Sequence, residues 1–170
     1  MLSTNQKGVI AETAIAHAAV KLWVGVSRPL SDLKYDFVFD VDGTLLRVQC
    51  KWAVRQDDVV LVRCYTNRRT RDGMLTRRYA HGEIDAFAAY CLELDRCYFL
   101  PFDVFGGRRL VHLRLAPSRN NQQLGIHWAR DYEFAATLPR LGAVAQLGEH
   151  DAGSVGVRGS SPLGSTSESR

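Results

Sequence analysis

The dipeptide Asp42-Gly43 constrains the fold of this chain most, because it joins two strand-like runs. KYDFVFD precedes it and TLLRVQCKW follows it, and polar and apolar residues alternate in both. Asp-Gly between two such runs is typical of a two-residue β-hairpin turn. The sequence therefore predicts a hairpin in which Val41 faces Thr44, and this pair fixes the register of all the others.

This register assigns every side chain of the hairpin to one of two faces. Asp36 lies opposite Gln49, and both share a face with Lys51, because successive side chains of a strand point to opposite sides. Asp40 and Asp42 belong to the turn. We therefore expect a half-buried hairpin with a polar cluster within cross-strand reach. The opposite face is wholly apolar: Phe37, Phe39, Val41, Leu46, Val48 and Cys50.

The middle of the hairpin, FDVDGTLL, also resembles the first motif of haloacid-dehalogenase-type phosphatases, with Asp40 as the nucleophile. That chemistry needs a loop and helix after the strand, a downstream cation and an acidic pair for magnesium. The run after the turn alternates as a strand, and Lys51 is the last lysine. Beyond the hairpin the only adjacent acids, Asp57-Asp58, follow too closely. The pattern disfavours the phosphatase, which is kept as an alternative.

The remaining chain shows further periodic segments. Apolar residues at helical spacing predict a helix from Asn5 to about Val24. A Val-rich run predicts a third strand over Asp58–Thr66, and HGEIDAFAAYCLELD (residues 81–95) predicts a second helix. Two more strands are expected in residues 96–107 and 108–115, around a Gly-Gly turn. A short helix is expected to end the polar segment 118–134.

Arginine dominates the charge of the chain. Of 22 basic residues 18 are arginine, and six lie in Arg63–Arg78 against a single acid, Asp72. Arginine binds phosphate bidentately and reads guanine edges, so this segment is a candidate nucleic-acid surface. Ordinary solvated loops remain the alternative for it and for the polar run SRNNQ. The candidate DNA contacts are Arg68, Arg69, Arg71, Arg77, Arg78, Arg119, Asn120, Asn121 and Gln122.

Length and composition fit one soluble domain. With 170 residues and 46% hydrophobic content the chain can bury a sizeable core. No apolar run approaches the roughly 20 residues of a membrane span, and the N-terminus lacks the basic region of a signal peptide. The cysteines have no zinc-ligand spacing and predict reduced core thiols of a cytosolic protein. They are Cys50, Cys64, Cys91 and Cys97.

Beyond about Leu141 the composition changes to Gly and Ser without apolar periodicity. We expect one domain over residues 1–141 and a poorly ordered tail over 142–170. The tail also resembles the conceptual translation of a transfer-RNA gene, because VAQLGE and GSSP are what the D-arm and T-arm consensus sequences encode in one frame. An ordinary flexible tail is the alternative interpretation.

The hairpin and its surroundings resemble the PD-(D/E)xK nucleases, most closely the intron-encoded homing endonucleases associated with transfer-RNA genes. That group has a Glu on a helix, an Asp on one strand and an acid-or-Gln-x-Lys on the next. Here GVIAETAI supplies Glu12, YDFVF supplies Asp36, and VQCKW supplies Gln49 and Lys51. GEIDAFAAYC, DRCYFLP and RDYEF also resemble the group, so the resemblance covers roughly Asn5–Phe134. It implies an α/β fold with a restriction-endonuclease-like core, a mixed β-sheet flanked by helices.

The resemblance also implies an activity, the site-specific double-strand cleavage of DNA by a homing endonuclease that depends on Mg²⁺ or Mn²⁺. Asp36, Glu12, Gln49 and the Cys50 carbonyl are the expected metal ligands, with Lys51 as a further catalytic residue. Most of the superfamily has a carboxylate at the position of Gln49, so the number of bound metal ions stays open. The homing subgroup itself has Gln there.

The same resemblance sets expectations about assembly and surroundings. Each chain offers one site, so cutting both strands implies a homodimer or a homotetramer. We expect a cytoplasmic, nucleoid-associated protein encoded by a bacterium or a phage, with no membrane partner. A Holliday-junction resolvase and a non-catalytic DNA-binding protein are the remaining alternatives.

Overall fold

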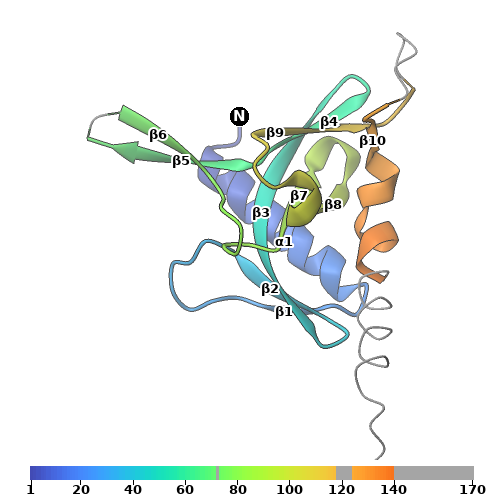
Figure 1. Ribbon diagram of the computed structural model, residues 1–170, viewed down its shortest axis with the longest axis horizontal. Helices are drawn as coiled ribbons and strands as arrows, with labels where there is room; N and C mark the ends of the chain where they lie inside the picture. The colour runs from blue at the N-terminus through green and yellow to red at the C-terminus, as the bar shows by residue number, and fades with distance from the viewer. Residues whose placement is uncertain (72, 118–123, 140–170) are drawn as a thin grey trace, which may run out of the picture.

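The computed structural model describes residues 1–71, 73–117 and 124–139, without the side chains of Arg68 and Arg69. The expected tail over 142–170 and the run from Arg119 to Gln122 lie outside these ranges. No helix within them is long and apolar enough to cross a membrane. Figure 1 shows α1 lying across a curved mixed sheet, from which a separate hairpin projects. In chain order the elements are α1 (Thr4–Val20), β1 (Gly25–Ser27), β2 (Phe37–Val41), β3 (Thr44–Gln56), β4 (Val59–Arg63), β5 (Tyr65–Thr70), β6 (Gly73–Arg78), β7 (Ala86–Cys91), η1 (Leu92–Leu94), β8 (Arg96–Pro101), α2 (Phe102–Phe105), β9 (Leu110–Arg114), β10 (His127–Trp128) and η2 (Ala129–Tyr132).

The hairpin β2–β3 has the predicted register. Val41 pairs with Thr44, and the pairing continues to Phe37 opposite Val48. The turn residues Asp42 and Gly43 have φ angles of 50° and 88°, as a two-residue hairpin turn with two positive φ angles requires. The predicted apolar face is confirmed, since five of its six residues are buried and the sixth is half-buried: Phe37, Phe39, Val41, Val48, Cys50 and Leu46.

Strand β3 is the centre of the sheet. One of its edges pairs antiparallel with β2 up to Val48 and then with β4 from Ala53 onward. Its other edge pairs in parallel with β7 over Val48–Ala53. Strands β2 and β4 therefore leave an opening along β3 at residues 49–52, which we call the fork. The rest of the sheet adds β1 to β2, β8 to β7, β9 to β4 and β10 to β9.

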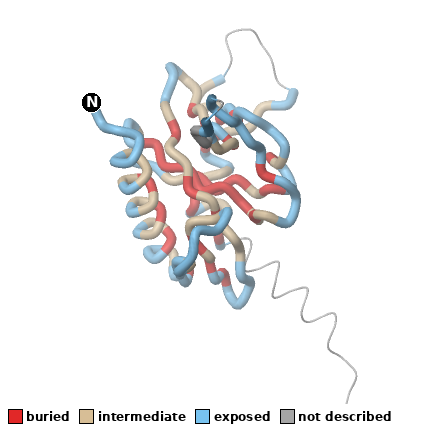
Figure 2. Tube along the Cα trace, turned by 90° about the vertical axis from the view of Figure 1, so that its left-hand side faces the viewer, coloured by how far each residue is buried: buried red, intermediate tan, exposed pale blue. Residues whose placement is uncertain are grey.

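The helix predicted over residues 81–95 is wrong, because Ala86–Cys91 is strand β7. All six of its residues are buried. Phe87, Ala89 and Cys91 lie in one core cluster, while Ala86, Ala88 and Tyr90 lie in the cluster on the opposite side. A strand buried on both faces is apolar without alternation, so its pattern resembles that of a buried helix. Figure 2 shows the buried residues concentrated in these central strands.

Helix α1 covers one face of the sheet. It buries Ala11, Ile15 and Ala19, which recur every fourth residue and join the cluster that contains Phe39. Its start is fixed by Ser3, whose hydroxyl accepts a hydrogen bond from the backbone N–H of Gln6 at 3.2 Å. The helix ends before the predicted Val24, and the sequence pattern missed the short strand β1 that follows.

The strand predicted over Asp58–Thr66 is two strands that belong to different sheets. Strand β4 ends at Arg63, where the backbone N–H of Cys64 donates to the carbonyl of Arg109 at 2.9 Å. The chain then leaves the main sheet, and β5 begins at Tyr65. This break places the arginine-rich segment outside the main sheet.

The arginine-rich segment is the hairpin β5–β6 and not a loop. We call residues 65–78 the arginine arm, and Figure 1 shows it projecting away from the body of the molecule. Every residue of β6 is exposed, including Met74 and Leu75. Because β6 buries no face, it carries no apolar alternation that would have predicted a strand.

Strands β8 and β9 confirm the strands predicted in residues 96–107 and 108–115, although the first ends at Pro101, earlier than predicted. They do not pair with each other, since β8 pairs with β7 and β9 with β4. The short helix α2 precedes the Gly-Gly pair between them. Near the end of the described chain, η2 and the helical residues 134–139 agree with the short helix that was expected there. The four cysteines are free thiols.

Candidate active site

Asp36 lies at the mouth of the fork, one residue before β2. Its backbone N–H donates to the carbonyl of Val48 at 2.9 Å, which extends the hairpin pairing by one bond. Its carboxylate oxygen Oδ2 accepts hydrogen bonds from the backbone N–H of Cys50, at 2.7 Å, and from Nε2 of Gln49. The fork exists because β2 has ended and β4 has not begun. On this edge of β3 the backbone N–H of Cys50 therefore meets a side chain, while β7 pairs with the other edge.

Burial raises the pKa of Asp36 above its ordinary value. The hydrogen bond from Cys50 opposes this rise, the negative charge of Glu12 adds to it, and Lys51 and Arg28 lower the pKa again. The net rise means that the cations nearby do not fully compensate the partly buried carboxylate. A further positive charge at this position would therefore be stabilised.

Lys51 points from β3 into a cage formed by residues from later elements. Its ammonium Nζ donates to the backbone carbonyl of Tyr65 at 3.0 Å and to the hydroxyl of Tyr79 at 3.1 Å. The same nitrogen lies 4.9 Å from the centroid of the Tyr79 ring and 6.0 Å from that of Phe87. Burial lowers the pKa of Lys51 to about 8, while Asp36 opposes the shift.

The sequence pattern gave no sign of these two tyrosines. Tyr65 and Tyr79 follow Lys51 by 14 and 28 residues, and neither occurs in a motif with it. Tyr79 is 8% exposed and packs edge-on against Phe87. Their contact with Lys51 depends on where the arginine arm leaves and rejoins the body of the protein.

Glu12 approaches the fork from α1. Its charge acts on both Asp36 and Cys50. The Glu12 carboxylate also accepts a hydrogen bond from Nη2 of Arg28 at 2.6 Å, and the Arg28 guanidinium lies 5.1 Å from the centroid of the Phe37 ring. The structure thus brings Glu12 to the site, as an ion pair with an arginine that the sequence pattern did not indicate.

The oxygen donors at the fork fit a hard divalent cation. Asp36 offers a carboxylate, and Cys50 offers a carbonyl that Nε2 of Gln49 contacts at 3.3 Å. Rotation of the Gln49 amide by half a turn would exchange its nitrogen for its oxygen. In the described part of the chain no three His, Cys, Asp or Glu side chains form a metal-binding group. The donor set therefore depends on an amide and a backbone carbonyl, which are normal ligands of such cations.

The predicted DNA-contact residues divide into two groups. Arg71 is exposed at the tip of the arginine arm, and the backbones of Arg68 and Arg69 lie in β5. At the base, Arg77 forms an ion pair with Glu83, and Nη1 of Arg78 donates to the carbonyl of Gly107 at 3.1 Å. The two base arginines are thus engaged with the body of the protein.

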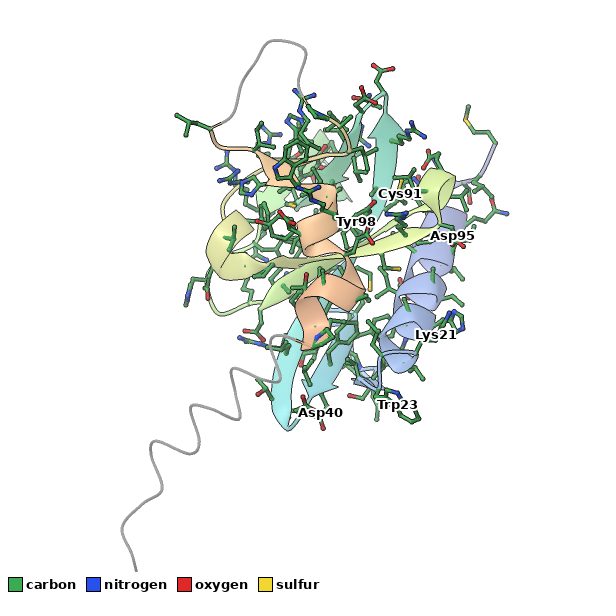
Figure 3. The ribbon with its side chains drawn as sticks, turned by 90° about the vertical axis from the view of Figure 1, so that its right-hand side faces the viewer. Lys21, Trp23, Asp40, Cys91, Asp95 and Tyr98 are labelled. Atoms are coloured by element: carbon green, nitrogen blue, oxygen red, sulfur yellow. The ribbon has the colours of Figure 1, made fainter. Side chains whose placement is uncertain are left out.

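The phosphatase alternative is wrong. Asp40 is exposed, and Figure 3 shows it at the turn end of the β2–β3 hairpin. Its Oδ1 accepts a hydrogen bond from the backbone N–H of Gly43 at 2.9 Å, and a 13-residue strand follows where that chemistry needs a loop and helix. Asp40 stabilises a turn, as Asp does in many hairpins.

Comparisons with known proteins agree with this fold and site. Residues 2–135 match the family model of the PD-(D/E)XK endonucleases. The structure is similar to that of a bacterial homing endonuclease, I-Ssp6803I, with 33% sequence identity and a TM-score of 0.68 over 85% of this chain and 99% of that one. A search of curated proteins gives no match. With a mixed sheet, a covering helix and a family match over most of its length, the chain belongs to the PD-(D/E)XK endonuclease family.

Proposed function

We propose that this endonuclease is a homing endonuclease that makes metal-dependent double-strand cuts at a specific DNA site. The observation that carries the proposal is the fork, where Asp36, Gln49 and the Cys50 carbonyl converge beside Lys51. The similarity to I-Ssp6803I, itself a bacterial homing endonuclease, supports the same function.

The proposed metal ligands are Asp36, Glu12, Gln49 through its side-chain oxygen, and the Cys50 carbonyl. A hard divalent cation such as Mg²⁺ or Mn²⁺, when bound there, polarises the phosphoryl group and acidifies a coordinated water. Asp36 contributes a negative charge that burial disfavours and that the nearby cations only partly neutralise. Glu12 adds a second carboxylate from α1, which can exchange Arg28 for another cation.

Lys51 is the proposed partner of the attacking water and of the phosphate. With a pKa near 8, Lys51 is protonated in most molecules at pH 7. Its ammonium can therefore donate hydrogen bonds to the charge that develops on the phosphate. The same lowered pKa makes the neutral amine accessible, and this form could accept a proton from water. Both roles require the nitrogen to be held at one position.

The arginine arm is the proposed DNA-contact surface. Two-stranded ribbons fit the major groove, and arginine side chains reach both phosphates and guanine edges. Arg68, Arg69 and Arg71 belong to its outer part, while Arg77 and Arg78 belong to its base. The polar run from Arg119 to Gln122 is proposed as a second contact on sequence grounds alone.

Target and assembly are inferred from separate observations. The tail resembles a translated transfer-RNA gene, so we infer that such a gene contains the cleavage site. Because one chain offers one fork, a cut through both strands needs a homodimer or a homotetramer. The setting that follows is the cytoplasm of a bacterium, at the nucleoid.

The direct test is cleavage of a plasmid that carries a transfer-RNA gene, with Mg²⁺, with Mn²⁺ and with a chelator, and with Lys51→Ala as the control. Discrete metal-dependent cuts that the variant loses support the proposal. Cleavage restricted to four-way junctions would instead identify a junction resolvase. Metal-independent binding without cleavage of any of these DNAs would identify a non-catalytic DNA-binding protein.

A further inference from the structure

Both hydrogen-bond acceptors of Lys51 lie at the base of the arginine arm. Tyr65 is the first residue of β5, and Tyr79 follows Arg78, the last residue of β6. Tyr65 and Arg78 are paired across the two strands. The two acceptor residues therefore lie close together, where the chain enters and leaves the arm. The proposed catalytic lysine thus touches the arm at the point where the arm joins the body.

The base of the arm is tied to the body by several contacts. Arg77 pairs with Glu83, whose other carboxylate oxygen accepts a hydrogen bond from the backbone N–H of Ala80 at 2.9 Å. Arg78 donates to the carbonyl of Gly107 at 3.1 Å. The guanidinium of Arg109 lies 5.6 Å from the centroid of the Tyr65 ring. These contacts fix the base in place, whereas Arg71 at the tip is exposed.

Tyr79 combines two contacts with Lys51. Its hydroxyl accepts one N–H of the ammonium, and the same nitrogen lies 4.9 Å from the centroid of its ring, close enough for an electrostatic contact with it. The ring is held by edge-to-face packing on Phe87, with the centroids 5.3 Å apart. An ammonium has three N–H donors, and in the described structure Tyr79 and Tyr65 accept two of them. One donor is left for water or phosphate.

We propose that Tyr79 is a positioning residue for Lys51, and that the anchored base of the arginine arm thereby holds the lysine in place for cleavage. The inference rests on the proposed role of Lys51. A lysine side chain has many rotamers, so an ammonium that lost an acceptor would spend less time in the productive position. In this arrangement the segment proposed to contact DNA also helps to build the catalytic site.

The test is Tyr79→Phe, which removes the hydroxyl and keeps the ring. The matched control is Tyr90→Phe, because Tyr90 is similarly buried, at 7% exposed. Its hydroxyl donates a hydrogen bond to Asp95, and its ring lies in the core cluster on the opposite side of the sheet. In Tyr79→Phe we expect the cleavage rate at saturating DNA to fall about tenfold, as the loss of a hydrogen bond to a charged group predicts. The DNA concentration at half saturation should stay unchanged, and Tyr90→Phe should change neither quantity.

A second readout observes Lys51 itself. The chain has four lysines, so lysine labelled with ¹³C at the ε-carbon gives four signals, and Lys51→Arg identifies the one of interest. ¹³C relaxation should show that the Lys51 ε-methylene is more mobile in Tyr79→Phe than in the wild type or in Tyr90→Phe. A slower cleavage rate with unchanged Lys51 mobility would overturn the proposal, as would no change in either quantity.

This readout separates the inference from the proposed function. If the wild type cuts no DNA, the proposed function fails, while the relaxation measurement still decides whether Tyr79 holds Lys51. If the wild type cuts and Tyr79→Phe leaves both rate and mobility unchanged, only the positioning role fails.

Discussion

The hairpins β2–β3 and β5–β6 have the same secondary structure for different physical reasons. The first buries one apolar face against α1 and joins the main sheet through three other strands, β1, β4 and β7. The second forms a separate two-stranded sheet, with every residue of β6 exposed. Burial therefore makes the first a rigid support, whereas the second depends on backbone pairing and on the contacts at its base.

This difference matches the division of labour that we propose. A site for phosphodiester cleavage needs groups held within a fraction of an ångström. The fork holds Asp36 directly before β2 and Lys51 on β3, beside the fully buried strand β7. A DNA-contact surface needs reach and exposed charge, which the arginine arm provides. The two hairpins meet where Tyr79 contacts Lys51.

The largest expected effect is the loss of cleavage when the fork is altered. Asp36→Asn keeps the shape of the side chain but removes the charge that would bind the cation. We expect single-turnover cleavage to fall at least about a thousandfold, while DNA affinity in a gel-shift assay stays within a few-fold of the wild type. Turnover close to that of the wild type would show that Asp36 is not part of the active site.

The next effect compares how much unfolding free energy is lost when one apolar side chain in each hairpin is truncated to alanine. Phe39 is fully buried and packs on Phe99 and Phe134, so Phe39→Ala should cost about 3–5 kcal/mol of unfolding free energy. Leu75 in the arm is 56% exposed, so Leu75→Ala should stay within about 0.5 kcal/mol. Urea denaturation measures both. Similar losses would show that the arm is packed in a way that its exposure does not indicate.

A smaller effect is expected on DNA binding. Replacing Arg68 and Arg69 by alanine should reduce the slope of log affinity against log salt by up to about 1.8, because each phosphate contact contributes about 0.9. The control is Arg130→Ala, whose side chain in the wild type is 76% exposed and lies outside the arm. Binding is measured by fluorescence anisotropy at several salt concentrations. An unchanged slope would mean that the arm is an ordinary solvated hairpin whose arginines do not contact phosphate.

The smallest effect concerns the ion pair between Arg47 on β3 and Asp85, which lies one residue before β7. Arg47 donates hydrogen bonds to both carboxylate oxygens of Asp85, and this interaction lowers the pKa of Asp85 below its ordinary value. A lowered pKa stabilises the fold above the unfolded-state pKa, and this stabilisation is lost as the pH falls through the folded-state pKa. Asp85→Asn should therefore cost about 1 kcal/mol at pH 7, since the pair is partly exposed.

The difference between Asp85→Asn and the wild type should disappear in strong acid, below the folded-state pKa of Asp85. Thermal unfolding at pH 7 and in acid measures it. Glu83→Gln at the base of the arm should have a smaller effect, because the Arg77 side chain donates to one oxygen of Glu83, whereas the Arg47 side chain donates to both oxygens of Asp85. Equal losses at both pH values would mean that Asp85 acts through packing and not through its charge.

The sequence predicted the parts of the fold that short-range patterns encode. Asp42-Gly43 and the alternation on either side of it gave the register of β2–β3, and with it the approach of Gln49 to Asp36. β7 was mistaken for a helix because a strand buried on both faces has no alternation. The sequence did not predict the strands of the arginine arm, because β6 buries too little for an apolar pattern to form.

The sequence by itself therefore determined the hairpin, its polar cluster and the family resemblance, because turn chemistry and alternation depend on neighbouring residues. Only the tertiary structure decided that β2 and β4 part at Cys50 to open the fork, and that Tyr65 and Tyr79 surround Lys51. The ammonium finds its partners where distant segments pack together. Contacts of that kind follow from the arrangement of the whole sheet, and no local spacing encodes them.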